Sequence, residues 1–99
     1  MLRVERHPEV FGELGAALAR YEDELPGLGK EFIEEYRATL DQIREDPQRW
    51  RKIRGNTRKL NFHRFPYAII YSIRPDAIYI KAVMHLHRLP GYWARRKEI

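Results

Sequence analysis

The sequence predicts an α+β fold in which a two-helix antiparallel hairpin packs on a small antiparallel sheet, in the order β-α-α-β-β-β. The first observation is that residues 57–93 hold most of the β-forming side chains, in three runs at 58–62, 67–73 and 78–85. The second is that turn residues, Pro66 and then Pro75 with Asp76, separate these runs. Gaps this short leave no room for a crossover helix, so the three runs are expected to form an antiparallel meander.

The N-terminal residues predict one more strand. In residues 2–6, Leu2 and Val4 alternate with charged side chains, which is typical of a short strand with one buried face. We expect this strand to pair with the later sheet. It should end at Pro8, which suits the first turn of a helix.

Two amphipathic helices are predicted to follow, because apolar residues recur at steps of three and four. The segment 26–29, Pro-Gly-Leu-Gly, predicts the turn between them, and Pro47 ends the second helix. The predicted buried stripes are Val10, Phe11, Leu14, Leu18, Tyr21 and Leu25 in the first helix, and Phe32, Tyr36, Leu40 and Ile43 in the second. We expect one core to bury Phe11, Leu14, Phe32, Tyr36 and Leu40 together with Ile69, Tyr71, Ile78, Ile80 and Ala82 of the strands.

Residues 48–56 show neither helical nor strand periodicity, and they are predicted to form a loop anchored by Trp50 and Ile53. Four basic residues surround these two apolar side chains. Interleaved arginine and tryptophan can stack on nucleic-acid bases. The alternative is that Trp50 fills a gap in the core at the end of the second helix.

Composition limits the classes of protein. A chain of 99 residues has room for one domain, here residues 1–99, with a modest two-layer core. No uncharged run approaches the length of a membrane span, so no membrane association is expected. The charged start lacks the apolar centre of a signal peptide, and the chain has no cysteine, so we expect a cytoplasmic protein without disulfides. No cofactor is predicted.

The charge is distributed unevenly along the chain. Residues 1–46 contain 6 basic and 12 acidic residues, whereas residues 47–99 contain 13 basic and 2 acidic residues. The second half should therefore attract an acidic partner, either nucleic acid or an acidic protein segment. The alternative is that these cations only solubilise a face of the sheet. The candidate binding residues are Arg49, Arg51, Lys52, Arg54, Arg58, Arg64 and Trp93.

The C-terminal residues contain groups suited to acid–base chemistry on RNA. His85 and His87 are two residues apart, so an extended segment would project both from one face, and Tyr92 could return near them. Cleavage beside a 2′-hydroxyl needs a base, an acid and a cation, which His85, His87, Tyr92, Arg88 and Lys59 could supply. Equally, His85 could orient the chain end by hydrogen bonds while Tyr92 and Trp93 pack on the sheet. A metal site is not predicted, because no carboxylate lies nearby in the sequence.

Several of these segments together resemble the RelE/ParE superfamily of toxins from bacterial type II toxin–antitoxin modules. They are the 26–29 turn, Phe65-Pro66-Tyr67, Tyr71 and the ending at 85–93, HLHRLPGYW. The resemblance covers essentially the whole chain. It implies the helix hairpin on a small sheet, and a cognate antitoxin whose acidic or amphipathic segment wraps over the toxin.

The superfamily divides by mechanism: RelE-like members cut messenger RNA on the ribosome, and ParE-like members inhibit DNA gyrase. By resemblance, Lys59 keeps one basic position of the RelE-like set, Arg88 matches another basic residue, and Tyr92 matches the C-terminal tyrosine of that set. Asn61, Ala68 and Leu86 stand where that set has cations, although Arg64 or Arg88 could replace one of them. An RNase needs a cation on the scissile phosphate. The ParE-like reading is therefore favoured, with an endoribonuclease as the alternative and a plain nucleic-acid-binding domain as a third possibility.

Overall fold

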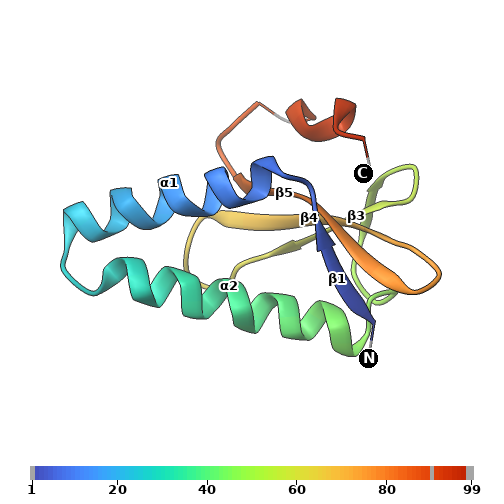
Figure 1. Cartoon of the computed structure of the whole chain (residues 1–99), viewed down its shortest axis with the longest axis horizontal. Coiled ribbons are helices and arrows are strands. Elements are labelled where there is room, and N and C mark those ends of the chain that lie inside the picture. The colour runs from blue at the N-terminus through green and yellow to red at the C-terminus, as the bar shows by residue number, and fades with distance from the viewer. Residues whose placement is uncertain (1, 90, 98–99) are drawn as a thin grey trace.

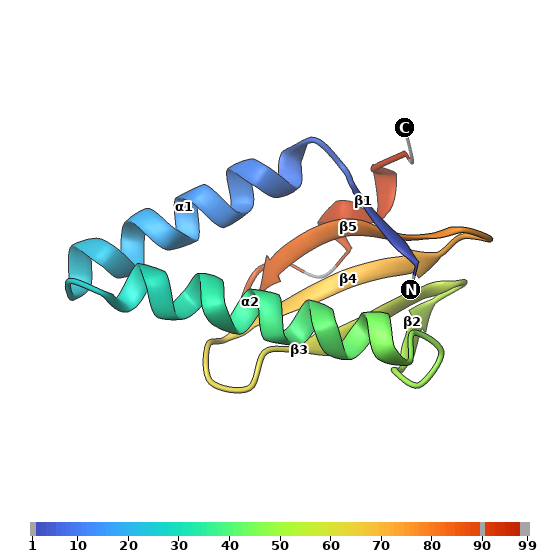
Figure 2. The same cartoon turned by 60° about the horizontal axis from the view of Figure 1, so that its bottom comes forward.

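The chain folds into one five-stranded sheet with two helices on one of its faces (Figures 1 and 2). The structure is a computed structural model, and it describes residues 2–89 and 91–97. The elements are β1 (Arg3–Arg6), α1 (Glu9–Glu24), α2 (Leu28–Glu45), β2 (Lys52–Arg54), β3 (Thr57–Asn61), β4 (Tyr67–Ile73), β5 (Ala77–His85) and a 3₁₀ helix, η1 (Tyr92–Arg95). None of the described helices has the length and apolar character needed to cross a membrane.

The strand order across the sheet is β1-β5-β4-β3-β2. The predicted meander is confirmed, because β3, β4 and β5 pair antiparallel in sequence order. Two expectations were wrong. β1 pairs parallel to β5, so the sheet is mixed rather than antiparallel throughout. The predicted loop at 48–56 contains β2, an edge strand antiparallel to β3, with Gly55 at a φ of 53° in the turn between them.

The two helices form the expected antiparallel hairpin through the turn at 26–29. Gly27 adopts a φ of 92°, a left-handed backbone conformation that residues with a side chain rarely adopt, and the second helix starts directly after it. Gly29 lets the helices approach closely, since a Cβ there would lie 2.8 Å from the backbone oxygen of Leu18. Figure 1 shows the helices separating with distance from this turn, with β1 lying where they are far apart.

The core between the helices and the sheet contains most of the residues predicted for it. Phe32, Tyr36, Leu40, Ile43, Ile69, Tyr71, Ile78 and Ile80 are all buried. The first helix is the exception. Phe11, Leu18 and Leu25 are 65%, 38% and 57% exposed, and Leu14 is only partly buried. The apolar stripe of α1 is wider than the surface that α2 and the sheet present to it, so its outer edge stays uncovered.

Ala82 was also predicted to lie in the core between the helices and the sheet, and this prediction was wrong. The register of β4 and β5 passes from Ile70 opposite Ala82 to Tyr71 opposite Ile80, which leaves Lys81 as an extra residue. This β-bulge reverses the alternation of β5 from that point. Ala82 consequently lies with Ala68, Ile70, Met84 and Trp93 in a second cluster, on the opposite face of the sheet.

Candidate functional site

The C-terminal segment returns across the sheet face that the helices leave free, where three of the predicted site residues, Arg54, Lys59 and Trp93, line one cavity. Gly91, at a φ of 85°, precedes η1, which places Trp93 against the second cluster. Trp93 is only 4% exposed. It was predicted as a binding residue, but it is buried in the same cluster as Ala68 and Ala82, so its ring is not available to stack on a base.

Glu13 of α1 holds this segment in place, and the sequence analysis missed it. Its carboxylate accepts hydrogen bonds from the Tyr92 hydroxyl at 2.5 Å, from Arg96 Nη1 at 3.0 Å and from the Val83 backbone N–H at 3.0 Å. The side chains of Glu13 and Arg96 are only 11% and 10% exposed. A signal was present, because Glu13 lies three residues after Val10 and four before Ala17, on the buried side of α1.

The position of Glu13 follows from the shape of the sheet. β1 pairs with β5 only as far as Ile80, so among residues 2–89 and 91–97 the outer edge of β5 has no strand partner beyond Ile80. Glu13 accepts from Val83 N–H on this edge, and Arg96 donates to the Lys81 carbonyl at 3.0 Å. The pair therefore satisfies backbone groups that would otherwise be buried without partners.

Tyr92 keeps its proton in this arrangement. Burial raises the pKa of Tyr92 far above its ordinary value, and the hydrogen bond to the Glu13 carboxylate raises it further. The guanidinium of Arg88 lies 3.7 Å from the centre of the Tyr92 ring. The phenol thus serves as a hydrogen-bond donor to Glu13 and is poorly suited to act as a base.

His85 and His87 do lie together, as expected from their spacing. Their ring centres are 5.1 Å apart, and the His87 backbone N–H donates to His85 Nδ1 at 3.1 Å. Burial lowers the pKa of His85, and the neighbouring His87 and Arg20 lower it further. His85 also lines a cavity of about 200 Å³ with Tyr67 and Arg88. Among the described residues, no three side chains of the metal-binding types are grouped to hold an ion.

Some of the predicted basic residues are exposed to solvent, and others contact neighbouring groups of the protein. Arg51, Lys52 and Arg54 are exposed on or beside the edge strand β2. Arg58 turns inward and donates to the backbone oxygens of Gln48 and Trp50, at 2.9 and 2.8 Å, so it braces the loop before β2.

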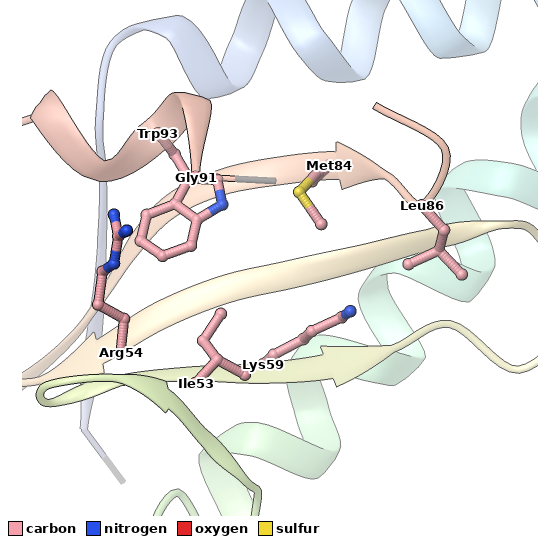
Figure 3. Close-up of a pocket in the computed structure, with 7 residues that line it drawn as sticks. All are labelled: Ile53, Arg54, Lys59, Met84, Leu86, Gly91 and Trp93. Carbon is pink, nitrogen blue, oxygen red and sulfur yellow. The ribbon is translucent and has the colours of Figure 1, made fainter. Parts of the chain in front are cut away.

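Two further basic residues, Arg64 and Arg49, have their guanidinium groups against other side chains, whereas Lys59 lines a cavity. Arg64 pairs with Glu31 at 2.8 Å, and the Arg49 guanidinium lies 5.0 Å from the Trp50 ring centre. Lys59 points away from the helices and lines a cavity of about 300 Å³ on the free face of the sheet, beside Trp93 (Figure 3).

Comparison with known proteins agrees with this architecture. The profile of the family described as the ParE toxin of the type II toxin–antitoxin system parDE matches residues 4–90. No curated protein matches the chain by sequence. A solved structure described as the chromosomal ParDE TA system from P. aeruginosa is similar in fold, with a TM-score of 0.77 at 12% identity, over 88% of this chain and 98% of that one. The family match covers most of the sequence, and the chain therefore belongs to the ParE toxins of type II toxin–antitoxin systems.

Proposed function

We propose that this toxin acts by binding and inhibiting DNA gyrase, without cutting RNA, and that its cognate antitoxin neutralises it. The observation that supports this most is the state of the C-terminal tyrosine. Tyr92 is locked as a donor to Glu13 and keeps its proton, so it contributes packing rather than proton transfer.

The surroundings of β4 support the same function. Ala68 stands where the resemblance to RelE-like nucleases places a strand arginine, and it is fully buried in the same cluster as Trp93. A phosphate at this position would meet an aliphatic surface and an indole ring. Stabilising the charge on a scissile phosphate requires a cation aimed at it, and that requirement is not met at Ala68.

A second candidate, cleavage of ribosome-bound messenger RNA, is favoured by the histidine pair. The lowered pKa of His85 keeps its imidazole neutral near neutral pH, which a general base requires. His87 lies close enough to serve as its partner. Proton transfer by a positioned side chain is typically worth about 10²–10⁴-fold in rate, so the two functions give different results in a direct test.

The test compares the wild type with a triple variant, His85→Ala, His87→Ala and Tyr92→Phe. As a gyrase inhibitor, the wild type should block supercoiling of relaxed plasmid by purified gyrase and leave messenger RNA intact on purified ribosomes. The triple variant should still inhibit gyrase, weakened only as far as packing of the chain end is disturbed. Circular dichroism and antitoxin binding serve as controls for its fold.

Site-specific cutting of ribosome-bound message by the wild type, lost in the triple variant, would refute gyrase inhibition without cleavage. His85, His87 and Tyr92 would then be catalytic residues, with Arg88 and Lys59 as the candidate cations.

A further inference from the structure

Three neighbouring cavities follow the junction between α1 and the C-terminal segment. Their volumes are about 390, 370 and 200 Å³, and Arg88 lines all three. The middle cavity shares Glu9 and Arg96 with the first. It shares Glu13 and Ala16 with the third. Figures 1 and 2 both show η1 close to the first turns of α1. Together the cavities form one continuous groove, which we call the α1 groove.

Basic side chains line the α1 groove from one end to the other. Arg20 lies at one end, and Arg95 and Lys97 lie at the other. Arg88 lies between them. All four side chains are exposed, and in residues 2–89 and 91–97 none of them forms an ion pair. Their charges are therefore available to a ligand.

The carboxylates in the groove leave most of this charge uncompensated. Glu13 is nearly buried, and Arg96 and two other donors already bind its carboxylate. Glu9 lies 3.7 Å from the same Arg96. With His7 and His85 neutral, the five arginine and lysine residues of the groove exceed its two carboxylates by three charges. Such a surface favours an anionic ligand.

Aromatic rings hold three of these cations in position. The guanidinium of Arg88 lies 3.7 Å from the centre of the Tyr92 ring, and that of Arg96 lies 5.0 Å from it. Arg20 donates a hydrogen bond to the Tyr67 hydroxyl, and its guanidinium lies 6.0 Å from the centre of that ring. Cations that are already positioned lose less side-chain freedom when an anion binds.

The length of the groove suits several phosphates of a nucleic-acid strand. It follows α1 from Glu9 to Arg20, a step of 11 residues, which corresponds to roughly 16 Å at about 1.5 Å per residue. One strand of duplex DNA carries a phosphate about every 3.4 Å along the helix axis, so about five phosphates span this length. Beyond Arg20 the acidic residues 22–24 end the basic surface.

We infer that the α1 groove binds the phosphate backbone of duplex DNA without reading its sequence. The exposed cations at positions 20, 88, 95 and 97 contact neighbouring phosphates, and the Arg96–Glu13 pair holds the C-terminal segment in place between them. The inference goes beyond gyrase inhibition, because it concerns direct contact between the toxin and DNA and does not require gyrase as the target.

Duplex DNA fits this groove better than a single strand does. Single strands are bound chiefly through bases that stack on exposed aromatic rings. Both tyrosine rings in the groove, Tyr67 and Tyr92, already lie against guanidinium groups. Contact with phosphates alone needs no free ring, and it is the way in which proteins bind duplex DNA regardless of sequence.

An acidic peptide fits the groove less well for a different reason. Peptides and proteins bind mostly through a few large side chains that fill pockets at the centre of the interface. The described aliphatic residues that line the groove are small or buried, and they are Pro8, Ala16, Ala17 and Val83. They give a large apolar side chain no pocket to fill.

Fluorescence anisotropy of a labelled duplex, titrated with purified toxin at several salt concentrations, tests the inference. Four phosphate contacts predict that log Kd rises with log salt with a slope of about 3.6, so Kd should increase about 10²-fold between about 50 and 200 mM salt. Arg20→Gln should lower this slope by about 1. Lys30→Gln removes one exposed charge from α2, outside the groove, and should leave the slope unchanged.

A charge-matched pair of triple variants locates the site. Replacing Arg88, Arg95 and Lys97 by glutamine should raise Kd at least tenfold and lower the slope to about 1, because one contact remains. The control should change Kd by less than about threefold, since distant exposed charges are screened. It removes the same charge from exposed positions on α2 and the loop after it, by glutamine at Lys30, Arg37 and Arg49. Circular dichroism and thermal unfolding check that both variants are folded.

Equal losses in the two triple variants would overturn the inference, as would a wild type that fails to bind the duplex at about 50 mM salt. So would tighter binding of a single strand of the same length, or displacement of the duplex by poly-glutamate at an equal concentration of charge. Gyrase is absent from this experiment, so its failure would leave gyrase inhibition to be judged by the supercoiling assay.

Discussion

Glu13→Ala is the substitution expected to destabilise this protein most directly through its C-terminal segment. It removes the carboxylate that accepts from Tyr92, Arg96 and the Val83 backbone N–H. The guanidinium of Arg96 would be left almost fully buried without an acidic partner at hydrogen-bonding distance. Removing one member of a buried ion pair typically costs about 3–5 kcal/mol, because the other charge remains desolvated.

The structure offers a control that contacts the same arginine. Glu9 lies 3.7 Å from Arg96 Nε, but its side chain is 67% exposed. Exposed pairs of this kind contribute about 0–1 kcal/mol, so Glu9→Ala should change stability little. The difference between the two substitutions isolates the effect of burial from that of charge alone.

Urea denaturation followed by tryptophan fluorescence measures both variants, with the free energy of unfolding extrapolated to water. Glu13→Ala should also lower Tm by roughly 15–30 °C, given the usual relation between stability and Tm for a chain of this size. In a double-mutant cycle with Arg96→Ala, the combined loss should fall short of the sum by about 1–3 kcal/mol. If Glu13→Ala and Glu9→Ala lower stability equally, the carboxylate does not hold the chain end as described.

The helix face and the buried tyrosines give two more predictions. Phe32→Ala should cost about 3–5 kcal/mol in denaturant unfolding, because Phe32 is fully buried, whereas Phe11→Ala, at a site 65% exposed, should cost less than about 1 kcal/mol. Similar losses for the two would contradict the packing of α1. Burial raises the pKa of Tyr71 to about 12, and that of Tyr92 is raised as well. The folded state therefore holds these protons more tightly than the unfolded chain, and the free energy of unfolding should fall as pH rises from about 10 to 12. Tyr71→Phe should reduce that slope, and a flat profile in the wild type would argue against burial of the phenols.

The sequence by itself was sufficient for β1, the two helices and strands β3, β4 and β5 in their order, but not for β2 or η1. The run at 67–73 corresponds to β4 without adjustment, and the other two strand runs are each within one residue of the observed bounds. These features are local, since period-two and period-3.6 patterns record which side of a segment is apolar. The turn at 26–29 was identified for the same reason, because proline and glycine restrict or free the backbone where they stand.

The candidate site was only partly predictable. The proximity of His85 and His87 follows from a spacing of two residues, and the exposure of Arg51, Lys52 and Arg54 follows from their charge. The bond of Tyr92 to Glu13 joins residues separated by 79 positions, and no local pattern encodes it. The same limit applies to Arg58, which was expected at the surface and instead donates to backbone oxygens in the loop before β2.

Tertiary structure alone decided how wide the buried face of each element is. It also decided to which face of the sheet the side chains of β5 point after the bulge. The stripe of α1 is apolar out to Phe11 and Leu18, but burial requires a facing surface, and α2 and the sheet cover only part of it. The extra residue Lys81 moves Ala82 to the opposite face of the sheet, a change that alternation in the sequence cannot reveal. Periodicity describes one segment at a time, whereas burial and hydrogen bonding depend on which segments meet.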